Sequence, residues 1–267
     1  MLAFSALPVA LAHGQSPGLG TSVETESAED RTPPSAVAAD PHIDNHWLAP
    51  TALVQPAGSV TVTNHMGIIH SGVTFGLGNA AQISVETLPF ALAVDGGNPN
   101  LGISGKIVLA DRGPTRVAMF GRGLAIDAKY STWWHGEVGG TTSYCFTADC
   151  SSLVSVAASL GVFGISAGSL EDGDGHRNVF ARVAAGLLLP LHPQVKLVGD
   201  VEFVANEGEF LAVPSAGLRL HGASWALQAV VLYGVKTRKQ YSYQEPMGRY
   251  ETFPTPVPWL NAAYRWN

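Results

Sequence analysis

Apolar and polar residues alternate strictly along much of the chain after residue 46. In the segment 195–203, Lys196, Asp200 and Glu202 occupy one set of alternate positions, and the other set is apolar. A helix would place apolar residues every three or four positions, whereas a period of two is typical of a strand with two chemically different faces. The same alternation recurs in residues 101–109, 179–189, 225–235 and 260–266.

Two kinds of β-protein produce such alternation. In a soluble sandwich or lipocalin-like barrel the apolar face points inward, whereas in a transmembrane barrel it points outward to lipid. Only 13% of the residues are Asp, Glu, Lys or Arg, roughly half the usual share for a soluble protein, which is too little for a water-facing exterior. We therefore predict an all-β, antiparallel, up-and-down transmembrane β-barrel.

A barrel with its apolar face outward encloses the polar positions of its strands. Most of these positions hold small uncharged residues, and a few charged ones are scattered among them. In a lumen, charges of opposite sign can pair. The interior then either admits a narrow aqueous path or is filled by these side chains and the N-terminal linker. The predicted lumen-facing charged residues are Lys106, Arg122, Arg182, Lys196, Asp200, Glu202 and Arg219.

Turn signals set the expected number of strands. Short turns near residues 78, 112, 148, 193 and 222 alternate with longer breaks at 95–100, 131–136, 171–176, 206–209 and 239–254. If residues 46–53 form a first strand, the count is twelve, and ten is the alternative; bacterial barrels have even numbers. The apolar face changes phase between residues 58 and 77, where we expect a bulge or an overlong strand. A second slip is expected at Pro89.

The segment 151–170 is uncharged, and a hydropathy window would flag it as a membrane-spanning helix. Gly164 and Gly168 even have the spacing of a helix-packing motif. However, Ser155 and Ser159 alternate with apolar residues, and no second segment of this kind exists to form a helical bundle. We interpret this segment as a strand.

The N-terminal segments precede the predicted barrel at residues 46–267. Residues 1–12 are apolar and end in Ala-Leu-Ala, which is typical of a secretory signal peptide. No Lys or Arg precedes this run, so either the natural start lies further upstream or the signal is atypical. Residues 13–45 are rich in Gly, Ser, Thr, Pro and Glu, and we expect a disordered periplasmic linker. Export together with a barrel predicts the outer membrane of a Gram-negative bacterium.

Cys145 and Cys150 are the only cysteines. In an exported chain a close pair favours a disulfide, here across the end of a hairpin, over free thiols or a metal site. No flanking Cys or His pair completes a metal site, and we predict no cofactor. The net charge of -6 also argues against nucleic acid as a partner.

Three segments carry a family resemblance. These are residues 46–52 (HWLAPTA), the Gly58-led strand that ends in Gly76-Leu77-Gly78-Asn79, and the final segment 258–266. Over residues 46–267 the chain resembles bacterial outer-membrane β-barrel proteins of the small porin-like kind, most of them uncharacterised. The resemblance implies contact with outer-membrane lipid and with the outer-membrane assembly machinery. That machinery recognises a final aromatic residue in many such proteins, whereas here Trp266 is penultimate.

Three groups of residues suggest chemistry. His65, His70 and Ser71 fit a Ser/His lipase at the lipid face, although no partner acid can be assigned, and histidines hydrogen-bonded to neighbours are the alternative. Residues 171–175 (EDGDG) resemble part of a calcium loop, but a solvated acidic loop explains them better. An aromatic group near a loop and strand ends fits either the membrane interface or a sugar-binding platform. The members of that group are Tyr130, Trp133, Trp134 and Tyr144.

These patterns leave two functions open, and we assign no catalytic residues. The first is a narrow channel or transport barrel for an unknown small solute, with a lumen set by the charged residues named above. The second is a closed structural or adhesion barrel that meets an external ligand through its loops, above all residues 239–254.

Overall fold

The structure is a computed structural model that describes residues 40–45, 48–65, 70–87, 100–128, 131–167, 176–206, 209–238, 249–252 and 256–266. The chain divides into two units, residues 1–35 and 36–267, and all the described residues belong to the second. Four predictions lie outside the described residues. They are the signal peptide, most of the linker, the slip at Pro89 and the acidic segment 171–175.

Fourteen strand segments make up the described fold. They are β1 (Val60–His65), β2 (His70–Gly76), β3 (Ala81–Thr87), β4 (Asn100–Arg112), β5 (Thr115–Ala128), β6 (Ser131–Cys145), β7 (Leu153–Ala167), β8 (His176–His192), β9 (Val195–Asn206), β10 (Glu209–His221), β11 (Trp225–Leu232), β12 (Val235–Arg238), β13 (Arg249–Thr252) and β14 (Val257–Trp266). Among the described residues, no helix is long and apolar enough to cross a membrane.

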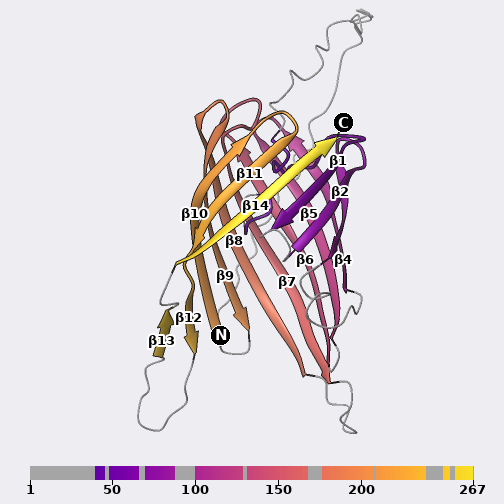
Figure 1. Ribbon diagram of the computed structural model, residues 1–267, viewed down its shortest axis with the longest axis vertical. Coiled ribbons are helices and arrows are strands. Elements are labelled where there is room, and N and C mark those ends of the chain that lie inside the picture. The colour runs from indigo at the N-terminus through magenta and orange to yellow at the C-terminus, as the bar shows by residue number, and fades with distance from the viewer. Residues whose placement is uncertain are drawn as a thin grey trace, which may run out of the picture. The chain divides into compact units, whose positions relative to one another are not determined.

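The segments form a closed barrel of twelve antiparallel strands. Each strand from β1 to β10 pairs with its neighbours in sequence, and β14 pairs with β1 to close the wall (Figure 1). Both β11 and β12 pair with β10, so they are two parts of one strand. Likewise β13 pairs with β12 and β14 with β11, which makes them two parts of the last strand. The predicted barrel with twelve strands is confirmed.

The two faces of the wall have the polarity of a transmembrane barrel. On β4, Leu101, Ile103 and Ile107 are each more than half exposed on the outside. On β9, Lys196 and Asp200 are buried inside. A soluble barrel would have the reverse arrangement, so the apolar exterior requires a non-aqueous surrounding such as lipid.

Aromatic side chains bound this apolar exterior. Tyr144 lies at one end of β6 and Trp134 near the other, and both share the outward face of the strand with the exposed Val138. The separation is about 33 Å of strand, or roughly 25 Å along the axis of a barrel with strands tilted by about 40°. That height is close to the ~25 Å apolar band, flanked by aromatic girdles, of outer-membrane barrels.

The first strand was predicted wrongly. The described part of residues 46–53 consists of bends inside the barrel, with one isolated bridge between Asn45 and Pro50. The twelfth strand comes instead from residues 58–77, which form the hairpin β1–β2 with Val60 opposite Phe75. The change of phase in that segment arises because β1 and β2 are two antiparallel strands and not one strand with a bulge. The predicted break at 131–136 is also wrong, because these residues pair with both neighbouring strands as part of β6.

A segment of the chain fills part of the lumen. We call residues 40–45 and 48–58 the plug. We call one end of the barrel the short-turn end, because it holds the short connections 77–80, 113–114, 146–152, 193–194 and 222–224. The plug lies at this end. The plug leaves the lumen past Gly76, where a Cβ atom would stand 1.8 Å from the Pro56 carbonyl oxygen. Only glycine permits this crossing. Residues 40–45, which the sequence placed in the linker, are turns within the barrel, and Asp40 is completely buried.

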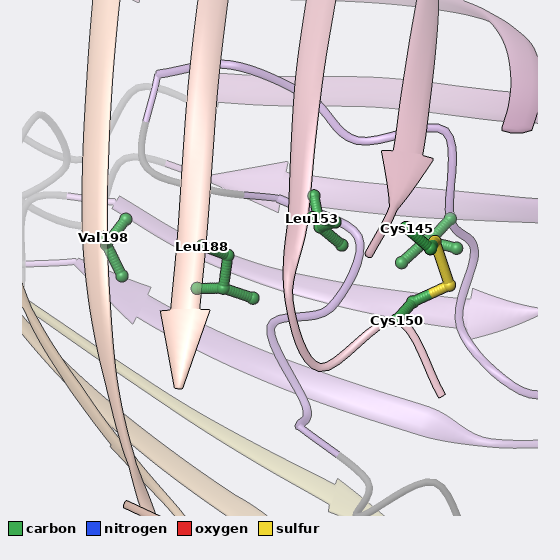
Figure 2. Packing of buried hydrophobic residues seen from close by; sticks show 6 residues of the cluster. Cys145, Cys150, Leu153, Leu188 and Val198 are labelled. Atoms are coloured by element: carbon green, nitrogen blue, oxygen red, sulfur yellow. A yellow bond between two sulfur atoms is a disulfide. The ribbon is translucent and has the colours of Figure 1, made fainter. Parts of the chain in front are cut away.

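One side of the plug packs on an apolar part of the wall. Leu53 contacts a buried cluster made by Leu153, Leu188, Val198 and the disulfide of Cys145 with Cys150. Figure 2 shows these side chains on adjacent strands beside the disulfide. The predicted disulfide is confirmed, and it closes the connection between β6 and β7.

Candidate functional site in the barrel lumen

The seven charged residues predicted for the lumen divide into two groups. The first contacts the plug at the short-turn end, and the second lies around or beyond the tip of the plug, where Leu48 and Ala49 stand. The first group is Lys106, Lys196 and Arg219, and the second is Arg122, Arg182, Asp200 and Glu202.

Asp40 anchors the start of the plug. Its Oδ2 atom accepts hydrogen bonds from Arg219 Nη1 and Lys196 Nζ, both at 2.9 Å. Arg219 also donates to the carbonyl oxygens of His42 and Asn45 at 3.0 and 2.8 Å. Burial alone would raise the pKa of Asp40, but the two cations hold it well below its usual range. Three buried charges therefore form a cluster that exists only while the plug is docked.

His42 lies inside the same cluster. Burial and the nearby Arg219 lower its pKa to about 4, against the opposing influence of Asp40 and Asp44. Its imidazole is neutral at pH 7, and its Nε2 atom has no hydrogen-bond partner among the described residues.

Asp44 ties the plug to the opposite side of the wall. Its two carboxylate oxygens accept hydrogen bonds from Gln55 Nε2 at 2.9 Å and Gln82 Nε2 at 2.8 Å. Its carbonyl oxygen accepts a hydrogen bond from Lys106 Nζ at 2.7 Å, and the same ammonium group donates to the Leu53 carbonyl at 3.2 Å. Buried backbone groups of the plug are thus satisfied by wall side chains, as buried polar groups require.

The tip of the plug is held by single hydrogen bonds from several strands. Ala49 N donates to Asp200 Oδ1 at 3.3 Å, and Ala52 N donates to Ser143 Oγ at 2.7 Å. The Pro50 carbonyl oxygen accepts a hydrogen bond from Thr141 Oγ1 at 2.8 Å.

A belt of alternating charges crosses the inner wall at the level of the tip. Glu137 on β6 accepts hydrogen bonds from Arg122, Arg182 and Ser159. Arg182 also donates to Glu202 at 3.0 Å and to the carbonyl oxygen of Leu48 in the plug. Glu137 was not among the residues predicted from sequence, because it directly follows residues 131–136, which were interpreted as a break. The sequence does contain a signal for Glu137. It lies two positions after His135 and four before Thr141, so the three residues share one face of a strand.

Between the plug and the wall made by β1 to β5 and β14 lies a cavity of about 400 Å³, which extends to the belt. Its wall includes hydroxyl groups of β1 to β4 and the rings of Phe120 and Trp259. Asn261, Arg122 and Arg182 also line it. The lumen is thus filled around Asp40 and the disulfide and hollow beside the plug and beyond its tip.

The remaining candidates are placed as follows. His65 and His70 are cross-strand partners on the hairpin β1–β2, and Ser71 Oγ accepts a hydrogen bond from Asn64 Nδ2 at 2.9 Å. No cluster of three or more His, Cys, Asp or Glu arranged to hold a metal occurs in the part of the chain that the structure describes.

The aromatic group does not form one surface. Tyr144 and Trp134 lie on the exterior near opposite ends of β6, and the guanidinium of Arg177 is 6.0 Å from the centre of the Trp134 ring. Trp133 shares the inward face of β6 with His135 and Glu137. Tyr130 lies outside the described residues. The exterior positions fit the membrane interface.

The fold, the apolar exterior and the polar lumen define the chain as a transmembrane β-barrel. No protein family and no curated protein sequence matches it. One similar solved structure is OmpT of Vibrio cholerae, with 11% identity and a TM-score of 0.40 over 74% of this chain and 64% of OmpT. The NanC porin has 8% identity and a TM-score of 0.39 over 77% of this chain and 98% of NanC. An anion-selective porin from Comamonas acidovorans has 10% identity and a TM-score of 0.35 over 73% of this chain and 57% of that porin. The chain spans less than two thirds of the first and third of these proteins. Identities and TM-scores this low carry no conclusion about the lumen of this chain.

Proposed function

We propose that this chain is an outer-membrane barrel that acts as a narrow channel or transport barrel, and that the plug closes it. The observation that carries the proposal is the way in which the plug is held. Its contacts with the wall are mostly hydrogen bonds and ion pairs, made by Asp40, Asp44 and the backbone of residues 42–53.

Polar attachment of this kind is reversible in water. When the plug leaves, water can replace each hydrogen bond that the wall side chains made, so the net cost per bond is about 1 kcal/mol. A barrel that needed only rigidity could fill its lumen with apolar side chains and avoid the desolvation of buried charges. Among the described residues, the large apolar side chains Ile43 and Leu53 of the plug pack against one cluster of the wall.

The outer membrane is the location that fits the barrel. The apolar exterior would face lipid, and the final strand β14, with Trp266 near its end, would be the segment that the assembly machinery recognises. A signal peptide at residues 1–12 would direct export. A small solute is the proposed cargo.

Ion conductance in planar lipid bilayers tests the proposal. The full chain should give rare, brief openings, and Asp40→Leu should raise the open probability at least tenfold, because it leaves Lys196 and Arg219 without their shared counter-ion. In open channels, Asp200→Asn should lower the preference for cations, because it removes a carboxylate from the lumen. Folded barrels that stay silent in all three forms would contradict a channel.

One observation favours the closed structural barrel as the second candidate. Asp40 and Arg219 are both completely buried, which suits a permanent filling as well as a gate. In that case the loops, above all residues 239–254, would meet an external partner. Silence of Asp40→Leu in bilayers, with the plug nevertheless released, would favour this candidate.

A further inference from the structure

The cavity beside the plug has the size and lining of a binding site. Its volume of about 400 Å³ lies within the range of small-molecule sites, roughly 300–1,000 Å³. It lies against β1 to β5 and β14, with the plug at its base. Any solute that follows the lumen past the plug would pass through it.

The charged groups in its wall already interact with other groups of the protein. Arg122 is paired with Glu137, and Arg182 is paired with Glu137 and Glu202. Asp44 and Lys106 are engaged by the plug and its contacts, and Glu86 accepts a hydrogen bond from Ser104. A ligand with a net charge would compete with these contacts, which is costly where the groups are buried.

Two buried polar atoms of the cavity wall remain to be satisfied. Among the described residues, the Oδ1 atom of Asn261 and the Nε atom of Arg182 have no hydrogen-bond partner, although both residues are more than nine-tenths buried. One of these atoms accepts a hydrogen bond and the other donates one. The wall near them also carries the hydroxyl groups of Thr63 and Ser104.

Two aromatic rings complete the lining. Phe120 on β5 and Trp259 on β14 both face the cavity. Such rings pack against apolar faces of a ligand, while the hydroxyl and amide groups around them fix its orientation.

We propose that this cavity, which we call the vestibule site, binds a neutral saccharide of one or two sugar units. A sugar carries hydroxyl groups that both donate and accept, matching Asn261 and Arg182, and C–H faces that match Phe120 and Trp259. A lipid chain would leave the polar wall unsatisfied. The inference rests on the proposed function, because it names the substrate class of the same lumen.

Calorimetric titration of the folded full chain in detergent tests the vestibule site, with glucose, maltose and sucrose as probes and gluconate as the charged comparison. At least one neutral sugar should bind more tightly than gluconate. Asn261→Val and Trp259→Leu should each weaken that binding about tenfold. Trp225→Leu, on the exterior of β11, should leave it unchanged, and circular dichroism with heat-modifiable gel mobility checks that each variant is folded.

The outcomes separate this inference from the proposed function. Absence of binding by all three neutral sugars, or tighter binding of gluconate, would overturn the vestibule site even if Asp40→Leu conducts ions. Unchanged sugar affinity in both vestibule variants would overturn it as well. Sugar binding that follows the expected pattern, in a barrel that never conducts, would uphold the site and refute the channel.

Discussion

The two halves of the lumen are built from the same kind of wall but are filled differently. At the short-turn end, wall side chains such as Lys196 and Arg219 are buried and bound to the plug. Further along, Arg122 keeps 45% of its side chain exposed beside the cavity. The alternation of polar residues is the same in both halves, so the pattern alone does not determine whether the wall faces protein or solvent.

The difference shows how a short segment can be held without a large apolar core. The plug offers backbone carbonyl and N–H groups, and the wall supplies a matching donor or acceptor at each level of the lumen. In the hollow half the same kinds of side chain remain available to a ligand. The predictions below perturb first the filled half and then the hollow half.

Loss of the Asp40 carboxylate should have the largest effect. Asp40→Leu removes the carboxylate that the buried Lys196 and Arg219 share, and breaking a buried ion pair in this way typically costs about 3–5 kcal/mol. Hydrogen–deuterium exchange of peptides from residues 40–58 measures the free energy of plug opening directly, and it should fall by this amount. Asp111→Asn is the matched control, because its pair with Arg116 is exposed and such pairs contribute at most about 1 kcal/mol. Equal effects of the two substitutions would refute the buried cluster.

Acid should weaken the plug through His42. The docked plug holds this imidazole with a pKa of about 4, whereas a free histidine titrates near 6.5. Between these values the released plug binds the extra proton, so docking is favoured fully above pH ~6.5 and loses up to about 3 kcal/mol as the pH falls toward 4. Asp40, with its lowered pKa, stays ionised throughout this window.

The pH effect is measured by the same exchange experiment, corrected for the intrinsic pH dependence of amide exchange. His42→Gln keeps a polar side chain that does not titrate, and it should remove the dependence between pH 6.5 and 4. The charged groups that act on His42 are Arg219, Asp40 and Asp44. An unchanged slope in His42→Gln would assign the effect to another group.

The disulfide should contribute a smaller, local part of the stability. Replacing Cys145 and Cys150 by Ser should cost about 2 kcal/mol, as expected for a short closed loop, and should loosen the cluster around Leu53. Urea unfolding of the barrel, monitored by circular dichroism, gives the change. Reduction of the wild-type protein should reproduce the double variant, and a difference between the two would point to a packing effect of serine.

Much of the wall could be predicted from sequence, and the plug could not. The face of Leu101 and Ile103 follows from a period of two, which any strand with two environments must show. The plug lacks periodicity, because residues 40–58 are held by side chains from distant strands, such as Asp200 for Ala49 and Ser143 for Ala52. Nothing local in the sequence encodes such contacts. The strand count was right although its first strand was wrong, since the hairpin β1–β2 replaced residues 46–53.

Arg122 offers the mildest perturbation, and it bears on the hollow half. Its side chain is partly exposed, and Glu137 keeps Arg182 and Ser159 as partners when Arg122 is removed. Arg122→Gln should therefore lower the unfolding free energy by no more than about 1 kcal/mol. Arg182→Gln, at a buried position that also holds the plug through Leu48, should cost several times as much. In open channels Arg122→Gln should nonetheless shift the reversal potential toward cations, because one positive charge leaves the lumen while Glu137 stays. Equal losses of stability in the two variants would mean that the hollow half is as tightly packed as the filled half, and the distinction between them would fail.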